Sequence, residues 1–353
     1  NPKTFPDGIR PDVRVLRDIL NADKMVSNRC WDIFNETKTG IKTVKKTTSK
    51  KKKQTVDNCS PATIYKKLDE RIIGQEEAKR KMSLAIRRKA MSEANPLISK
   101  INLMLIGPTA SGKTELARVA SEITACPFVK IDCSHLTPSG YKGVNVDSIL
   151  LRLFEAANGD IEKAQNGIVL LDEFDKIIRN GEFSSRIQQE LLKLIEGDVF
   201  PFEIDKHKPL QRMDTTGILF IAAGSFPGIE AIVSPKKTNI SLASPRVEIV
   251  HDPASSNNVE AKHLIKFGLI PEIVGRFTHT ATLKKLGSNE MFEILCRKKG
   301  NVAEEYTEIF KEMGQDISFS EDFLREIAYK AGQSETGARN LKFLMEEALG
   351  DYL

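Results

Sequence analysis

The chain has 353 residues, of which 40% are hydrophobic and 29% charged. This composition excludes collagen-like, low-complexity and wholly disordered proteins, and the length favours two domains plus an extension. No apolar run approaches the roughly 18 residues of a membrane-spanning helix. The formal net charge of +5 is too small to indicate a nucleic-acid partner by itself.

The five cysteines form no Cys-x-x-Cys pair, and their number is odd. A disulfide framework and a zinc ribbon are therefore both disfavoured, and we expect free thiols in a reducing compartment. That compartment is the cytoplasm or, as an alternative, an organelle matrix. The chain begins at Asn1, so a targeting peptide that had been removed would leave no trace in it.

Residues 1–60 differ from the rest of the chain. Residues 42–53 contain seven lysines and a single large apolar residue, Val44. Like charges at this density repel one another and do not pack, so we predict an N-terminal extension with a disordered, lysine-rich linker. The alternative is that this basic linker contacts nucleic acid or acidic partners.

Residues 61–284 are predicted to form a large α/β domain. Short apolar runs indicate buried strands, and helical patterns lie between them. Strands alternating with helices predict a mainly parallel sheet with helices on both faces. The expected strands are 101–106, 128–131, 168–171 and 218–221. Helices are expected within 68–88, where apolar residues recur at helical spacing after Gly74, and at 114–123, 146–157 and 185–195.

Residues 285–353 lack strand signals and predict a smaller, mostly helical domain. Ser288 and Ser320 are expected N-caps, and Glu321 and Asp322 follow the second in the first helical turn. We expect this domain to be cut short at Leu353.

The segment from Gly107 to Thr114 matches the P-loop (Walker A) pattern G-x-x-x-x-G-K-[ST] in full, between a predicted strand and a predicted helix. In such a loop, backbone N–H groups bind phosphate oxygens. Lys113 would reach the β- and γ-phosphates, and the Thr114 hydroxyl would ligate Mg²⁺. The expected ATP-binding residues here are Gly107, Pro108, Thr109, Ala110, Ser111, Gly112, Lys113, Thr114 and Glu115.

Asp172 and Glu173 follow the apolar run 168–171. They therefore lie at the C-terminal end of a predicted strand, where open α/β sheets bind ligands. We expect Asp172 to hold Mg²⁺, and Glu173 to polarise the water that attacks the γ-phosphate. Both acids, with Lys113, predict an ATPase that uses ATP and Mg²⁺.

Five blocks of the sequence occur in a characteristic order: residues 71–79, 164–176, 188–197, 267–276 and 337–339. Together they resemble the ClpX family of AAA+ protein unfoldases, the Clp/Hsp100 ATPases that partner the ClpP peptidase. The resemblance implies an AAA+ fold, a homo-hexameric ring, and unfolding of tagged or unfolded proteins by threading through a central pore.

The resemblance also assigns individual residues. Ile72 and Ile73 match the segment that lines the adenine pocket. Arg276 matches the catalytic arginine finger that a subunit extends to its neighbour's nucleotide, and Arg339 matches the sensor-2 arginine. The sensor-1 residue is not fixed, although Ser225 is the polar side chain nearest to its place.

The Gly-Tyr-Lys-Gly segment 140–143 matches the family's pore loop, whose aromatic residue grips the substrate. Tyr141 is the expected gripping residue, whereas Lys142 stands where the family has an aliphatic side chain. Residues 206–208 lie roughly where the family has a basic loop at the pore entrance, with a solvated surface loop as the alternative.

Two parts of the family pattern are missing from this sequence. The N-terminal zinc-binding domain needs two Cys-x-x-Cys pairs, and none occurs. No Ile-Gly-Phe-like tripeptide lies between Phe226 and Phe267, so docking on a ClpP-type peptidase is not implied.

Two other function classes stay open. The first is an AAA+ motor on nucleic acid, of the loader or branch-migration type, which the pore-loop motif and the lack of a DNA-binding domain disfavour. The second is a nucleotide-gated scaffold, which would require loss of Glu173. No membrane partner is expected.

Overall fold

The computed structural model describes residues 60–95, 97–138, 145, 147–179, 181, 183–204, 209–234, 259–296, 301–334, 336–350 and 352. The predicted extension and lysine-rich linker fall outside these ranges, except for Ser60. Tyr141, Lys142 and the basic segment 206–208 also lie outside the described residues.

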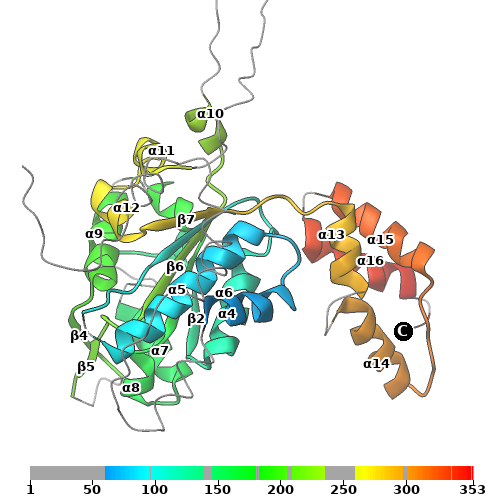
Figure 1. Ribbon diagram of the computed structural model, residues 1–353, viewed down its shortest axis with the longest axis horizontal. Coiled ribbons are helices and arrows are strands. Elements are labelled where there is room, and N and C mark those ends of the chain that lie inside the picture. Colours follow the sequence, from blue (N-terminus) through cyan, green and yellow to red (C-terminus); the bar gives the residue numbers. More distant parts are fainter. Residues whose placement is uncertain are drawn as a thin grey trace, which may run out of the picture. The chain divides into compact units, whose positions relative to one another are not determined.

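A five-stranded parallel sheet organises the larger part of the described chain (Figure 1). Its strand order is β2-β3-β6-β1-β7, so β1 and β3 lie on either side of β6. The strands are β1 (Leu103–Ile106), β2 (Phe128–Asp132), β3 (Ile168–Asp172), β6 (Leu219–Gly224) and β7 (His279–Thr282). The prediction of an α/β domain built on a parallel sheet is confirmed.

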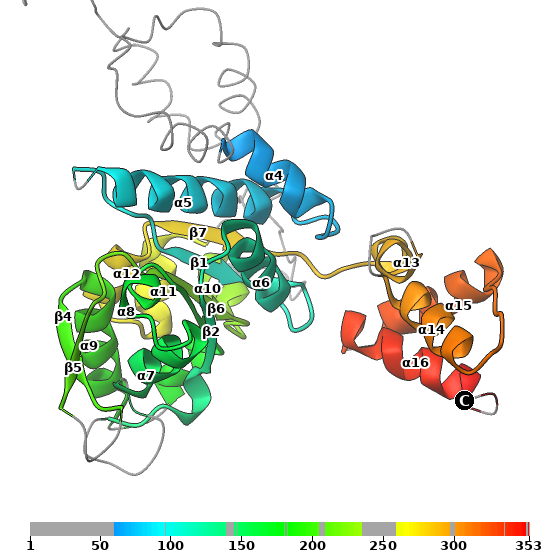
Figure 2. The same ribbon diagram turned by 90° about the horizontal axis from the view of Figure 1, so that it is seen from below.

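Helices cover both faces of this sheet (Figure 2). One face packs against α4 (Pro61–Asp69), α5 (Glu76–Ala94) and α6 (Lys113–Thr124). The other packs against α7 (Asp147–Ala156), α9 (Phe183–Glu196), α11 (Ala261–Phe267) and α12 (Pro271–Arg276). Two short helices, α8 (Ile161–Ala164) and α10 (Ile229–Val233), and two 3₁₀ segments, Cys133–His135 and Phe174–Arg179, complete this part.

The predicted central strands are those with continuous apolar runs. All five residues of β3 and all six of β6 are buried, as expected for parallel strands covered on both faces. Alternate residues of β3 enter opposite apolar clusters: Leu170 packs with α4, α5 and α6, and Leu171 packs with α7 and α9. Each face of the sheet therefore has its own core.

Three strands were not expected from the sequence. Strand β7 is polar, with the sequence His-Thr-Ala-Thr, and it lies at the edge of the sheet. Strands β4 (Val199–Phe202) and β5 (Gln211–Asp214) form a separate antiparallel pair. Strands β5 and β7 lack an apolar run, and β4 (Val-Phe-Pro-Phe) contains a proline, which disfavours the prediction of a strand.

The last part of the described chain is helical. It comprises α13 (Ser288–Cys296), α14 (Val302–Glu312), α15 (Glu321–Gln333), a 3₁₀ turn (Gly337–Arg339) and α16 (Asn340–Leu349), which share an apolar cluster of their own. Ser320 is the N-cap of α15, because its Oγ accepts a hydrogen bond from Phe323 N at 3.3 Å. The N-cap prediction for Ser288 is wrong, because Ser288 is itself the first residue of α13 and the Gly287 N–H bonds the Glu290 carboxylate at 3.0 Å.

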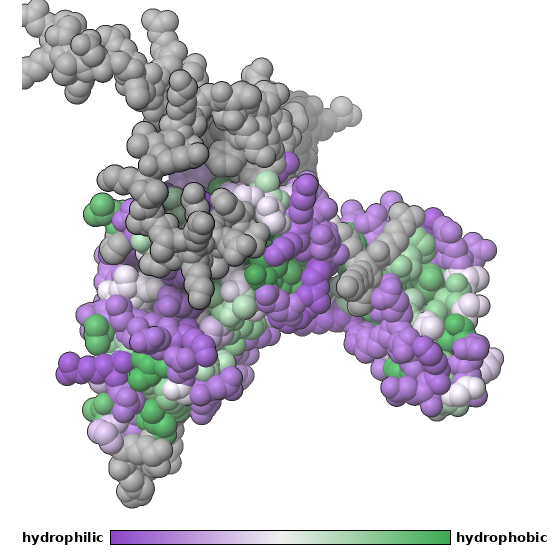
Figure 3. Space-filling model, turned by 60° about the horizontal axis from the view of Figure 1, so that its bottom comes forward, coloured by the Kyte–Doolittle hydropathy of each residue, from purple (hydrophilic) through white to green (hydrophobic). Residues whose placement is uncertain are grey.

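The surface seen in Figure 3 is mostly hydrophilic, with apolar residues in small separate groups. Leu97, Leu210, Tyr329 and Phe343 are among the exposed large apolar residues. None of the helices in the described ranges combines the length and apolar character that crossing a bilayer requires.

Candidate active site

The phosphate loop opens into a cavity of about 500 Å³ at the C-terminal ends of β1, β2, β3 and β6. Because this is the edge of a parallel sheet at which ligands bind, its position suits a substrate site. It brings the loop and the acidic pair of the sequence prediction together. Its lining residues are Thr109, Ala110, Gly112, Lys113, Thr114, Glu115, Lys130, Asp132, Asp172, Glu173, Asp175, Lys176, Gly224, Ser225, Ala338 and Arg339.

The loop joins the buried strand β1 directly to helix α6. Gly112 has φ +94° and precedes the helix as its N-cap, without any side-chain cap hydrogen bond. The first N–H groups of α6 therefore remain available to an anion, and the helix dipole favours negative charge there. The Ser111 hydroxyl is buried and has no hydrogen-bond partner among the described residues. This orphaned donor suits a bound phosphate.

Lys113 is folded back onto its own loop. Its Nζ donates to the Gly107 and Pro108 carbonyl oxygens, each at 2.7 Å. Burial lowers the pKa of Lys113 to about 8, although Asp172 and Asp175 oppose the shift. The ammonium is therefore held at the loop by carbonyl groups that a phosphate oxygen can replace.

Asp172 accepts hydrogen bonds on both carboxylate oxygens. Its Oδ1 accepts from Glu173 N at 3.0 Å. Its Oδ2 accepts from Thr114 Oγ1 at 3.2 Å and lies 2.9 Å from Lys130 Nζ. The Thr114 hydroxyl of the phosphate loop and the Asp172 carboxylate at the end of β3 are thus in direct contact.

Glu173 lies at the mouth of the same cavity and is exposed. Its φ is +53°, in the left-handed region that non-glycine residues rarely adopt. Strain of this kind clusters at functional sites, where the surrounding structure holds it. The backbone therefore places this carboxylate at the cavity rather than in the apolar layer below it.

The magnesium ion that the sequence predicts fits these donors. Mg²⁺ takes oxygen ligands and is bound through one or two protein groups together with substrate phosphates. Thr114 Oγ1 and Asp172 Oδ2 lie 3.2 Å apart and line one cavity with the phosphate loop. The two side chains therefore supply the hydroxyl and carboxylate oxygens that such a site needs.

Sequence reasoning missed several residues of the cavity. Lys130 and Asp132 project from β2, and Asp132 pairs in register with Asp172 on β3. Asp175 is buried, accepts from Ser225 N at 3.0 Å and pairs with Lys176 at 3.0 Å. Asp132 directly follows the predicted strand 128–131, so the strand-end argument used for Asp172 could have found it. The contact of Lys130 with Asp172 depends on the pairing of β2 with β3, for which the sequence contains no signal.

Gln75 is a further residue without a sequence assignment. Its side-chain amide donates to Ser111 O at 3.0 Å and to Lys284 O at 2.8 Å, and it accepts from Lys284 N at 2.9 Å. One amide thus ties the phosphate loop to the chain that follows β7. Ile72 and Ile73, just before Gln75, are buried, and neither lines the cavity.

The two predicted arginines occupy different places. Arg339 lines the cavity. Arg276 does not line it: it ends α12, is half-exposed and forms an ion pair with Glu196. The structure therefore does not bring Arg276 to the phosphate loop of its own chain.

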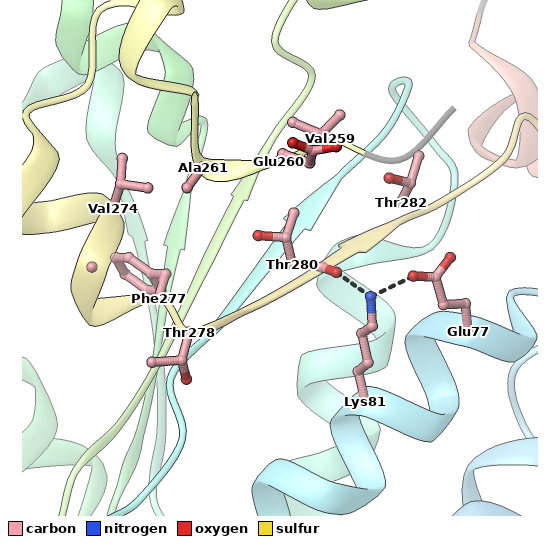
Figure 4. A pocket seen from close by; sticks show the side chains of 11 residues that line it. Glu77, Lys81, Val259, Glu260, Ala261, Val274, Phe277, Thr278, Thr280 and Thr282 are labelled. Carbon is pink, nitrogen blue, oxygen red and sulfur yellow. Dashed lines mark hydrogen bonds and ion pairs between the residues drawn. The ribbon is translucent and has the colours of Figure 1, made fainter. Parts of the chain in front are cut away.

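A second cavity, of about 490 Å³, lies beside the edge strand β7 (Figure 4). Thr278, Thr280 and Thr282 line it, and Lys81 bonds both Glu77 and the Thr280 carbonyl oxygen, as the dashed lines show. It has neither a phosphate loop nor the Asp172–Glu173 pair. We therefore assign the candidate active site to the first cavity.

Comparison with known proteins agrees with this site. Residues 98–280 match the family model described as AAA domain (Cdc48 subfamily). Proteins named "ATP-dependent Clp protease ATP-binding subunit ClpX" are similar over most of the chain. The one from Treponema denticola is 36% identical over 315 residues, covering 83% of this chain and 76% of that protein. The one from Borrelia duttonii is 37% identical over 317 residues, covering 83% and 74%.

Proposed function

Because the chain belongs to the ClpX family of AAA+ ATPases, which are ATP-dependent Clp unfoldases, we propose that the first cavity binds and hydrolyses ATP to drive protein unfolding. The relatives confirm the family that the five sequence blocks indicated, and they do not favour the nucleic-acid motor. One observation carries the proposal: Lys113, Thr114, Asp172 and Glu173 line one cavity at the C-terminal edge of the sheet.

The residues of the cavity and of the phosphate loop have separate proposed roles. The α6 N–H groups, the Ser111 hydroxyl and the Lys113 ammonium bind the phosphates, and Lys113 would exchange its two carbonyl partners for phosphate oxygens. Thr114 and Asp172 hold Mg²⁺. When bound, that ion neutralises charge on the transferring phosphoryl group. Glu173 orients and polarises the attacking water.

Arg276 is proposed to act on the nucleotide of a neighbouring subunit. It is half-exposed and lies away from its own phosphate loop, as a residue acting across a subunit boundary should. A finger of this kind is worth roughly 10³–10⁵ in rate in other NTPases. This role requires a ring, and the family resemblance implies a homo-hexamer.

Arg339 and the helical region after residue 284 are proposed to respond to the nucleotide. Arg339 lines the cavity, so its guanidinium can pair with phosphate charge. Ile72 and Ile73 are proposed to shape the adenine pocket, and Gln75 fixes the segment that carries them to Ser111.

Polypeptide substrates are proposed to be gripped by Tyr141 and Lys142, by analogy with the family's pore loop. The flat tyrosine ring offers contact area without reading sequence. The lysine beside it adds a positive charge and favours acidic segments.

The relatives compared above are named as subunits of a Clp protease, but this chain has no Ile-Gly-Phe-like docking tripeptide between Phe226 and Phe267. We propose an unfoldase that does not couple to a ClpP-type peptidase through this tripeptide. Its odd number of cysteines and the lack of a Cys-x-x-Cys pair in its sequence are consistent with a reducing compartment, either the cytoplasm or an organelle matrix.

Steady-state ATP hydrolysis with added macromolecules tests this function. We expect unfolded protein to stimulate turnover and double-stranded DNA to leave it unchanged. Stimulation by DNA alone would instead support the nucleic-acid motor. Glu173→Gln is the control for turnover by a contaminating ATPase.

A further inference from the structure

Lys130 is a second lysine at the cavity, and no sequence motif assigns it a role. It lies in β2, where its main chain pairs with Leu170 of β3. Its side chain reaches along β3 to Asp172, and Nζ lies 2.9 Å from Oδ2. An ammonium group therefore contacts the carboxylate that is proposed to hold the metal.

Both oxygens of Asp172 are already in use. Oδ1 accepts from Glu173 N, and Oδ2 faces two donors, Thr114 Oγ1 and Lys130 Nζ. A carboxylate oxygen has two lone pairs, so Oδ2, the oxygen beside Thr114, has no further acceptor position for Mg²⁺ or a water bound to it, whereas Oδ1 keeps one. For Mg²⁺ to be held jointly by Thr114 and the oxygen that Thr114 contacts, one of the two donors to Oδ2 must leave.

Thr114 does not need to leave. A hydroxyl that ligates a metal through its oxygen keeps its hydrogen, which can still be donated to Asp172. Lys130 has three donors and no lone pair when it is charged, so it cannot share the position with a metal-bound water. Lys130 is therefore the donor that Mg²⁺ would displace from Oδ2.

We propose that Lys130 is a resident cation that competes with Mg²⁺ for Asp172 and supports nucleotide binding when the metal is absent. Its side chain is 45% exposed and lines the same cavity as the phosphate loop. It can therefore turn from Asp172 to a phosphate oxygen without disturbing the core. This inference rests on the proposed nucleotide site and adds to it a control of metal dependence.

The test measures the dissociation constant of a fluorescent, non-hydrolysable ATP analogue in MgCl₂ and in EDTA. Lys130→Met should increase the ratio of the EDTA value to the MgCl₂ value by about fivefold relative to wild type. Loss of the competitor strengthens metal-assisted binding, and loss of the cation weakens metal-free binding, so both effects raise the ratio. Fivefold corresponds to about 1 kcal/mol, the upper end for an exposed ion pair.

Two variants control for nonspecific effects. Lys130→Arg keeps the charge and should keep the wild-type ratio. Lys163→Met removes a lysine that pairs with Asp160 at the similar distance of 3.0 Å outside the cavity, so the ratio should not change. The melting temperature of each variant, measured without nucleotide, shows that it is folded.

The outcomes separate the inference from the proposed function. If the wild type and a folded Lys130→Met variant both bind the analogue and have the same ratio of EDTA to MgCl₂ dissociation constants, Lys130 does not compete with Mg²⁺. The proposed function then still stands. If the wild type binds no analogue in MgCl₂ or in EDTA, both are wrong.

Discussion

Replacement of Gly107 by alanine tests the close packing behind the phosphate loop. A Cβ on Gly107 would lie 2.6 Å from the Leu283 carbonyl oxygen and 2.9 Å from Leu283 Cβ. Ordinary contacts begin at 3.4 Å, so the oxygen and the new methyl group must separate by about 0.8 Å. Backbone bonds resist this movement, because Leu283 N donates to Ile106 O at 2.7 Å and Gly107 N donates to Gly224 O at 3.1 Å.

We therefore expect Gly107→Ala to lower the free energy of unfolding by about 1–3 kcal/mol, the usual cost of overpacking. In a domain of this size each kcal/mol corresponds to a fall of about 2–4 °C in the melting temperature. Displacement of the phosphate loop should also weaken binding of the fluorescent ATP analogue. Thermal unfolding and nucleotide titration measure the two effects separately.

Gly275→Ala is the matched control. Gly275 lies in α12, and a Cβ there would meet nothing within 4 Å. Alanine is favoured over glycine within helices by roughly 0.5–1 kcal/mol, so stability should not fall. If Gly107→Ala melts at the wild-type temperature and binds nucleotide normally, the account of a tightly fixed loop is refuted.

Four further changes have distinct expected results. Glu173→Gln should reduce ATP turnover by about 10²–10⁴-fold while analogue binding persists; turnover within tenfold of wild type would contradict the assigned role. Tyr141→Ala should keep ATPase activity and lose unfolding of a tagged protein, and normal unfolding by this variant would remove the pore-loop proposal. Ser320→Ala should cost about 1 kcal/mol in urea unfolding, because the Phe323 N–H loses its cap; unchanged stability would show that the cap contributes little. Burial, followed by the charge of Lys89, lowers the pKa of Lys100 to about 7, whereas an unfolded lysine titrates near 10.4. As the pH rises, Lys100 therefore loses its proton in the folded chain before it does so in the unfolded chain. The free energy of unfolding of the wild type, relative to that of Lys100→Met, should rise from pH 6 to pH 9. If the difference between the two proteins did not change with pH, the lowered pKa would be excluded.

The sequence was informative where one local pattern determines the structure. The P-loop motif requires a strand before it and a helix after it, and β1 and α6 occupy those places. Continuous apolar runs identified β3 and β6 because both strands are buried on two faces. Strand β7 was missed because an edge strand does not need such a run, and its polar residues resemble a loop.

The parts that sequence reasoning missed depend on contacts between distant segments. The sequence pattern indicates that Lys130 is an exposed residue of a half-buried strand. Only the pairing of β2 with β3 brings it to Asp172. Gln75 and Lys284 are 209 positions apart and are joined only by the folded chain. Periodicity and motif spacing contain no information about such pairs.

Loss of fluorescence from a tagged fluorescent protein, followed with ATP and purified chain in the presence of a ClpP-type peptidase, tests the central claim most directly. The account predicts ATP-dependent loss of fluorescence, no loss with Glu173→Gln, and a substrate that stays intact on a denaturing gel. Fluorescence that persists while the wild type hydrolyses ATP would contradict the assignment as an unfoldase for that substrate.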